Sequence, residues 1–170
     1  METGAKADKT EIIIEPGKQD IIFKRVFDAP RDIVVRVMMD PELVPQWWGP
    51  AKYAVDVDVM EPRAGGRWRY VTRADDGDEH AFHGVYHEVS ADRIVQTNEY
   101  EGYPGEVALE TSRFEERDGK TYMTAVSLAS SVEVRDAVVA SGMEGGAREL
   151  YNRLDEVIQR VAQEAQPVSA

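Results

Sequence analysis

The chain has 170 residues, which is enough for one domain with a sizeable hydrophobic core. It contains no cysteine, which excludes disulfide frameworks and thiolate metal sites. We expect a cytoplasmic location, with which the absence of cysteine agrees. Its 20 basic and 32 acidic residues give a net charge of −12, which disfavours nucleic acids and anionic membranes as partners because both attract positive surfaces.

The composition of the two ends predicts the domain boundaries. Both ends are small and polar, so we expect a flexible N-terminal segment over residues 1–18 and a frayed tail over 166–170. No repeat or linker divides the remainder, so residues 19–165 are predicted to form a single domain. We find neither a long apolar run nor a signal-peptide pattern, and therefore expect a soluble protein.

The first predicted elements are one strand and two short helices. Residues 20–27 (DIIFKRVF) mix β-branched and aromatic residues with charged ones, which is typical of a strand. A helix is predicted over 28–39, with Pro30 suited to its first turn. A second short helix is predicted over 40–50, where a Gly-Pro pair ends it.

From residue 53 onward the hydrophobic period changes to two, which indicates half-buried strands. The predicted strands are 53–60, 65–73, 81–89, 93–100, 106–116 and 121–129. Short turns rich in glycine, aspartate and serine separate them. Such tight connections favour an antiparallel meander.

Two more helices are predicted at the C-terminal end. Ser130 and Glu133 resemble a capping box for a short helix over 132–140. The longest helical pattern runs from about Gly146 to Glu164 and has one apolar stripe. That stripe contains Ala147, Leu150, Tyr151, Leu154, Val157, Ile158 and Val161. We therefore predict an α+β fold in which about six or seven antiparallel strands curl around this helix, because a half-buried sheet needs a cover.

Several short motifs occur in a characteristic order along the chain. They are FDAP, DPE, WWGP, GGRWR, G-x-Y-x-E and a Gly-Met pair followed by Leu-Asp. Over residues 20–162 this order resembles the START-like (SRPBCC) superfamily, and within it the AHSA-type branch, named after activators of a heat-shock-protein ATPase. The resemblance implies a helix-grip fold with a cavity between sheet and long helix. Such relatives include ligand carriers, polyketide cyclases, self-sacrificing resistance proteins and co-chaperones, so the fold alone does not decide the function.

Two adjacent tryptophans, Trp47 and Trp48, end the second short helix. Neighbouring helical residues point about 100° apart, so the two rings cannot face one core equally well. The resemblance puts the short helices at the mouth of the cavity. We therefore expect one indole to pack into the core and the other to line the cavity. We favour Trp47 as the core residue and Trp48 as the cavity residue, and the reverse assignment stays open. The alternative is that both rings are hydrophobic plugs.

The remaining candidate ligand-binding residues follow from the alternation of side chains along strands. Trp68 and Tyr70 share one face of their strand, and Gln96 and Asn98 face the helix if Ile94 does. Polar groups on an inner face need another side chain, water or a ligand as a partner. The predicted site contains Trp47, Trp48, Trp68, Tyr70, Tyr86, Gln96 and Asn98. The opposite register would leave both amides in solvent.

The three histidines do not predict a metal site. On a strand with a rise of about 3.3 Å per residue, His83 and His87 would share a face but lie about 13 Å apart, and His80 would lie on the other face. The arginines at positions 67, 69 and 73 are expected to face solvent and pair with acidic residues on neighbouring strands.

No pattern identifies catalytic residues or a cofactor. A nucleophile elbow, a phosphate-binding glycine loop and a dinucleotide fingerprint are all missing from the sequence, so we expect no cofactor. We interpret Gly65 and Gly66 as a turn or close approach, and Gly145 and Gly146 as close packing of helix on sheet.

The function predicted from these patterns is binding of a small, largely apolar molecule in the cavity. A cyclase or hydrolase-type enzyme that uses polar groups of the cavity is one alternative. A protein-interaction module that activates a chaperone ATPase is another, with the chaperone as its partner. An enzyme would show a converged titratable pair with shifted pKa values, whereas an interaction module would show a filled cavity and an exposed apolar patch.

Overall fold

The computed structural model describes residues 9–166, which form eight strands, three α-helices and one short 3-10 helix. In chain order these elements are β1 (Glu11–Ile13), β2 (Asp20–Phe27), α1 (Arg31–Met39), η1 (Val44–Gln46), β3 (Ala54–Met60), β4 (Arg67–Arg73), β5 (Glu79–Val89), β6 (Arg93–Tyr100), β7 (Val107–Arg117), β8 (Lys120–Leu128), α2 (Val132–Ala140) and α3 (Met143–Glu164). No helix within 9–166 combines the length and apolar character that crossing a lipid bilayer requires.

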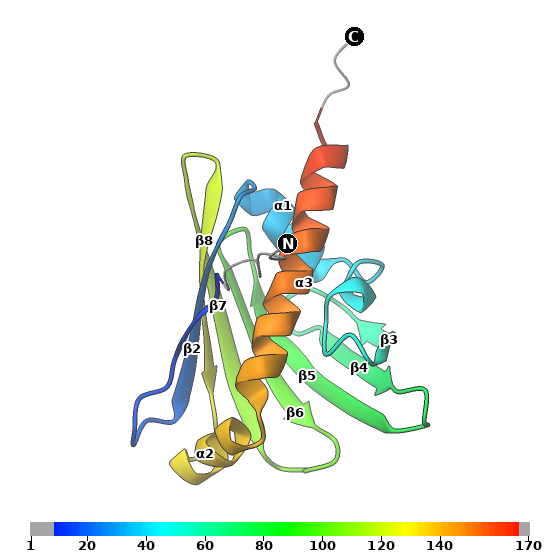
Figure 1. Ribbon diagram of the computed structural model, residues 1–170, viewed down its shortest axis with the longest axis vertical. Coiled ribbons are helices and arrows are strands. Elements are labelled where there is room, and N and C mark those ends of the chain that lie inside the picture. Colours follow the sequence, from blue (N-terminus) through cyan, green and yellow to red (C-terminus); the bar gives the residue numbers. More distant parts are fainter. Residues whose placement is uncertain (1–8, 167–170) are drawn as a thin grey trace, which may run out of the picture.

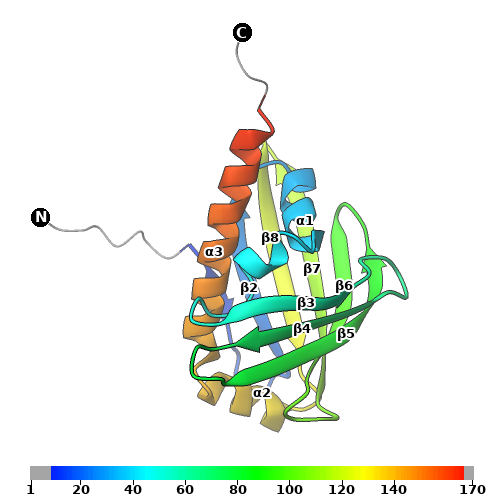
Figure 2. The ribbon, with the colours of Figure 1, turned by 90° about the vertical axis from the view of Figure 1, so that its right-hand side faces the viewer.

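All the strands form one antiparallel sheet in the order β1-β2-β8-β7-β6-β5-β4-β3. The sheet curves around α3, which runs along its concave side, and α1 lies beside α3 (Figure 1 and Figure 2). The α+β helix-grip fold predicted from the sequence is therefore confirmed. The sheet has eight strands, one more than the upper end of the predicted range.

The additional strand, β1, lies inside the 1–18 segment that the sequence analysis predicts to be flexible. It is rich in isoleucine, which favours a strand, and Ile13 pairs with Ile22 of β2. The polar composition of the first ten residues therefore does not represent the whole segment. Residues 1–8 and 167–170 of the two predicted terminal segments lie outside the described residues.

Local chemistry explains the helix ends and changes two details of the prediction. The backbone carbonyl of Pro30 accepts the first hydrogen bonds of α1. The second predicted helix is reduced to the three residues of η1. Ser131 caps α2, because its Oγ accepts a hydrogen bond from the backbone N–H of Val134 at 3.1 Å. Ser130, the predicted cap, donates to the Glu106 carboxylate instead.

The long helix α3 is packed unequally along its length. Its C-terminal half buries the residues that the apolar stripe predicts: Leu154, Val157, Ile158 and Val161. Its N-terminal half is only partly buried and contains Gly145 and Gly146. The interpretation of these glycines as close helix–sheet contacts is wrong, because a Cβ added at either one meets no atom within 4 Å. The helix therefore leaves space beneath its first turns.

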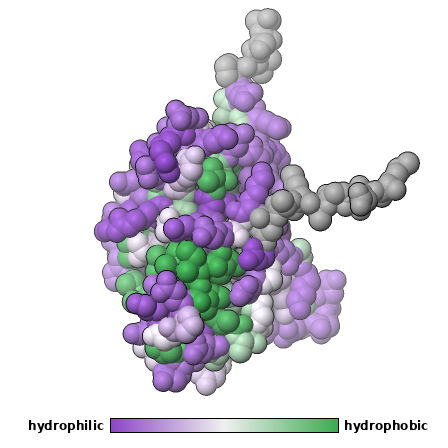
Figure 3. Space-filling view, turned by 60° about the vertical axis from the view of Figure 1, so that its left-hand side comes forward, coloured by the Kyte–Doolittle hydropathy of each residue, from purple (hydrophilic) through white to green (hydrophobic). Residues whose placement is uncertain are grey.

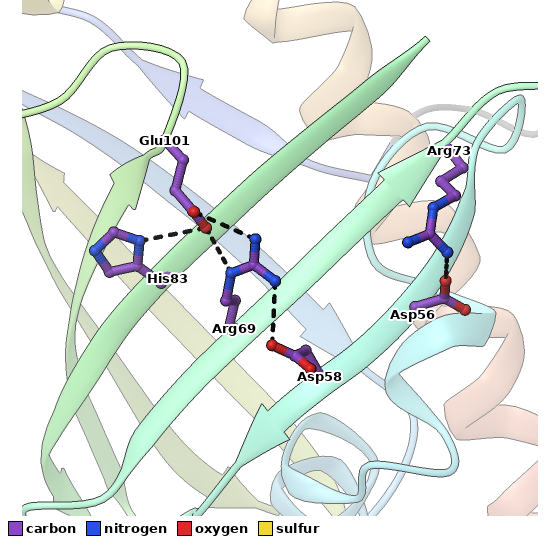
Figure 4. A network of polar contacts seen from close by, with 6 residues as sticks. All are labelled: Asp56, Asp58, Arg69, Arg73, His83 and Glu101. Atoms are coloured by element: carbon purple, nitrogen blue, oxygen red, sulfur yellow. Dashed lines mark hydrogen bonds and ion pairs between the residues drawn. The ribbon is translucent and has the colours of Figure 1, made fainter. Parts of the chain in front are cut away.

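The convex face of the sheet carries the arginines of β4. Arg69 donates to Glu101 at 2.8 Å and to Asp58 at 3.1 Å, and Arg73 pairs with Asp56 (Figure 4). The contacts with Asp56 and Asp58 join β4 to its neighbour β3, as predicted from the sequence, whereas Glu101 lies just after β6, beyond β5. Exposed ion pairs of this kind contribute only about 0–1 kcal/mol each to the free energy of unfolding. This network therefore makes the convex face polar but adds little to the stability of the fold.

Candidate functional site: a cavity beneath the first half of the long helix

A cavity of about 820 Å³ lies between the concave face of the sheet and the N-terminal half of α3. This volume is within the range of about 300–1,000 Å³ that is usual for small-molecule pockets. Small side chains on both sides leave the space open, with Gly146 and Ala147 on the helix and Ser112, Ala125 and Ser127 on the sheet. The apolar cover is completed by Met38, Met39, Met143 and Leu150.

One side of the cavity is a group of four rings that we call the aromatic wall: Trp48, Tyr70, Phe82 and Tyr100. The Trp48 ring meets Tyr70 and Phe82 edge-on, with centroid separations of 5.2 and 5.1 Å. Phe82 continues to Tyr100 at 5.1 Å. Because these rings support one another, they present a preformed apolar surface to a ligand.

Beside the aromatic wall lies a group of polar residues on β6, β7 and β8 that we call the polar floor: Gln96, Asn98, Glu110, Ser112 and Ser127. Glu110 is paired across the sheet with Gln96 on one side and with Ser127 on the other. The Asn98 amide donates to Glu110 Oε1 at 3.1 Å. Adjacent strands therefore bring together polar groups that are distant in the sequence.

The environment of the polar floor favours protonated side chains. Burial raises the pKa of the Glu110 carboxyl above its ordinary value of 4.5, and the hydrogen bond from Asn98 opposes this shift only in part. The pKa of the Tyr151 phenol, on α3, is raised by burial and then by the charge of Glu110. Burial also raises the pKa of Tyr70 in the aromatic wall.

His80, Tyr100 and Asp78 form a polar cluster at an exposed edge of the cavity. His80 Nε2 lies 3.0 Å from Asp78 Oδ2, and His80 Nδ1 lies 2.7 Å from the Tyr100 hydroxyl. Tyr53 also donates to Asp78 at 3.0 Å. The hydrogen bonds from His80 and Tyr53 lower the pKa of the Asp78 carboxyl. This cluster holds in place the rings that border the opening.

Five of the seven predicted site residues line the cavity: Trp47, Trp48, Tyr70, Gln96 and Asn98. Trp68 and Tyr86 do not, although they lie on the predicted face of the sheet. Trp68 lies beneath the Tyr70 ring at a centroid distance of 4.8 Å, and its Nε1 donates across Gly84 to the Thr97 carbonyl at 3.1 Å.

Tyr86 is also a core residue rather than a cavity residue. It is completely buried, and its hydroxyl lies 3.5 Å from that of Tyr70. Both placements have one physical cause, since strand alternation fixes the face of a side chain but not the depth at which neighbouring rings cover it. Glu110, Phe82 and Tyr151 also line the cavity, although the sequence patterns do not predict them as site residues. The signal that could have identified Glu110 is the alternation of side chains along its strand: Phe114, four residues later, is buried, so Glu110 lies on the same inner face.

The convex face is chemically different from the cavity and includes an apolar area. Leu109 and Leu128 are cross-strand partners on β7 and β8, and each is 41% exposed. Figure 3, which turns the side with β2 and β8 forward, shows a hydrophobic area surrounded by hydrophilic residues.

A second hollow, of about 780 Å³, is bordered by charges of both signs such as Lys24, Arg113 and Glu115. Those charges make it a poor site for an apolar ligand.

Solved structures similar to this chain share its fold. A protein from Rhodobacter sphaeroides has a TM-score of 0.80 at 27% identity, covering 88% of this chain and 99% of that chain. A protein from Arthrobacter aurescens has a TM-score of 0.81 at 23% identity, and the match covers 88% of this chain and 91% of that chain. A protein from Staphylococcus epidermidis has a TM-score of 0.75 at 25% identity, and the match covers 92% of this chain and 98% of that chain.

No curated protein matches the chain. The match that identifies the family is instead a family model, described as "Activator of Hsp90 ATPase homolog 1-like protein", over residues 28–159. This range contains all of the sheet except β1 and β2, together with most of α3. The chain therefore belongs to the Activator of Hsp90 ATPase homolog 1-like family of the START-like (SRPBCC) superfamily.

Proposed function

We propose that this protein binds a small, largely apolar molecule in the cavity between the sheet and α3. The observation that carries the proposal is the cavity itself, about 820 Å³ in volume and lined by an aromatic wall, an apolar cover and a localised polar floor. Small-molecule sites usually combine an apolar lining with a few polar groups that fix orientation. Trp47, Trp48, Tyr70, Gln96 and Asn98 are the predicted binding residues that this geometry supports.

The two glycines of α3 offer a matched test. Gly146 lines the cavity, whereas Gly145 is exposed and does not, and both have open space around an added Cβ. Isopropylnaphthalene is a suitable apolar probe, and its binding is followed by tryptophan fluorescence. Gly146→Leu should weaken binding at least about tenfold, because overfilling a packed site costs about 1–3 kcal/mol. Gly145→Leu should bind like the wild type, and equal effects of the two variants would locate the probe elsewhere.

The geometry supports binding more than catalysis. A cyclase or hydrolase would need a base beside an acid. The interacting titratable pair in the cavity is Glu110 on the polar floor and Tyr151 on α3, and the pKa values of both are raised, so both favour the protonated form. This pair therefore does not supply a base next to an acid.

A second candidate function is protein interaction through the convex face, with a chaperone ATPase as the partner. The exposed pair Leu109 and Leu128 favours it, because contiguous apolar surface often marks an interface. The family description also refers to an activator of the Hsp90 ATPase. The test is the ATPase rate of purified Hsp90 with and without this protein. Activation should be lost in Leu109→Lys and kept in Gly146→Leu, whereas an unchanged rate with wild-type protein would remove this candidate.

A further inference from the structure

We propose that Glu110 is the polar anchor of the cavity and that it donates a hydrogen bond, as a neutral carboxylic acid, to a carbonyl or ether oxygen of an otherwise apolar ligand. This inference rests on the proposed function, because it names the chemical class of molecule that the same cavity takes. It also assigns a role to a residue that the sequence patterns did not single out.

The position of Glu110 differs from that of the other carboxylates on the sheet. On the convex face, Glu101 is bonded to Arg69 and Glu88 to Arg93. Glu110 faces the opposite way, into the cavity, and within residues 9–166 it forms no ion pair. A carboxylate held there would be both poorly solvated and uncompensated, which is costly.

The groups that face Glu110 from each neighbouring element are uncharged. They are Gln96 and Asn98 from β6, Ser127 from β8 and Tyr151 from α3. Asn98 uses Glu110 Oε1 as its acceptor, which leaves Oε2 to carry the proton. The raised pKa of the carboxyl agrees with this geometry. Apolar surroundings can keep a carboxylic acid neutral so that it acts as a donor.

The surroundings of Glu110 also have unused hydrogen-bonding capacity. Among the described residues, neither the Gln96 side-chain amide nor the Tyr151 hydroxyl hydrogen-bonds to another protein group, yet both residues line the cavity. Both side chains are half-buried, so each has a free polar group that a ligand oxygen or hydroxyl placed near Glu110 could bind. The aromatic wall would at the same time cover the apolar part of the ligand.

Three probes of nearly equal shape separate the alternatives: acetylnaphthalene, which carries a carbonyl, isopropylnaphthalene, which has none, and naphthylethylamine, which is a cation. Their Kd values are measured by tryptophan fluorescence for wild type, Glu110→Gln and Glu110→Leu. We expect the wild type to bind the ketone roughly tenfold more tightly than the hydrocarbon, which is the usual strength of one buried hydrogen bond. Glu110→Gln should keep this preference because its amide donates, and Glu110→Leu should lose it.

The other outcomes are equally informative. Equal binding of ketone and hydrocarbon by the wild type would overturn the anchor role while leaving the proposed function intact. Tightest binding of the amine, lost in Glu110→Gln, would show an ionised carboxylate and also overturn it. Failure of all three probes to bind would refute both proposals. If Glu110→Leu does not fold, the wild type alone remains decisive, because its ketone preference should fall as rising pH ionises Glu110, and a constant preference would contradict the proposal.

Discussion

The Trp48 ring packs edge-on against the Tyr70 ring, with their centroids 5.2 Å apart and their planes at 76°. Trp47, the preceding residue in the chain, is instead 6% exposed, and its Nε1 donates to the Val37 carbonyl at 3.2 Å. The Trp47 indole is thus fixed to α1 in the core, although its edge reaches the cavity. The Trp48 indole is part of the aromatic wall. Two adjacent large rings can therefore serve different purposes because successive side chains point in different directions.

This division predicts opposite effects for the two tryptophans. Trp47→Ala should reduce the free energy of unfolding by about 3–5 kcal/mol, as is usual for deleting a buried large aromatic side chain. Trp48→Ala should reduce it less but should weaken isopropylnaphthalene binding more. Urea denaturation and probe titration of both variants measure the two effects. A Trp48→Ala variant that is strongly destabilised yet binds the probe normally would contradict the assignment.

The packing of α3 predicts a gradient of sensitivity along the helix. Leu154 has no exposed surface and lies in its tightly packed half, so Leu154→Ala should cost about 2–5 kcal/mol. Both leucines border the cavity, but Leu150 is only partly buried, so Leu150→Ala should cost clearly less. Thermal and denaturant melts compare the two. A melting temperature of Leu154→Ala within about one degree of wild type would show that this helix is not central to the core.

The raised pKa of Glu110 predicts how stability depends on pH. The folded protein binds this proton more tightly than the unfolded chain, whose ordinary pKa is 4.5. Relative to Glu110→Gln, the wild type should therefore lose stability as pH rises from about 4.5 to the folded-state pKa, and should change no further above it. Denaturant melts between pH 4 and 9 measure this difference.

Glu101 provides a control of opposite sign. Its pKa is lowered, first by the hydrogen bond from Arg69, so its stabilising contribution is present above the ordinary pKa and is lost as pH falls through the folded-state value. Relative to Glu101→Gln, the wild type should gain stability as pH rises. The difference between wild type and variant should therefore change with pH in opposite directions for Glu110→Gln and Glu101→Gln. A change in the same direction would contradict the environments described for the concave and convex faces.

A buried arginine on the concave face predicts a further sensitive position. Arg25 of β2 is 4% exposed and donates to Asp155 at 2.9 Å and to Asn152 at 2.7 Å, both on α3. Asp155→Ala should lower the free energy of unfolding by an amount near the low end of about 3–5 kcal/mol, because it leaves the Arg25 guanidinium without its counter-charge. Arg25→Met should be milder, since the charge itself is removed. Equal losses in denaturant melts would show that packing, not charge, dominates there.

The sequence was sufficient to predict the sheet and the long helix because their hydrophobic periods are regular. Alternation from Ile94 also indicates the face on which Gln96 and Asn98 lie. It could not indicate that Trp68 is covered, since the depth of a side chain depends on how neighbouring rings, here Tyr70 two residues along β4, pack over it. Glu110 was missed for a related reason, because its proximity to Asn98 and Tyr151 depends on strand register and on the placement of α3.

The most direct test of the central claim is to map a bound probe by heteronuclear NMR. Acetylnaphthalene is titrated into the isotope-labelled protein, and chemical-shift changes and intermolecular contacts are assigned to residues. Binding in the cavity predicts contacts with the Trp48 indole, the Asn98 side-chain amide and the Ala147 methyl group, which all line it. Contacts confined to Leu109 and Leu128 on the convex face, or no contacts at saturating probe, would contradict the claim that the space beneath α3 is a ligand site.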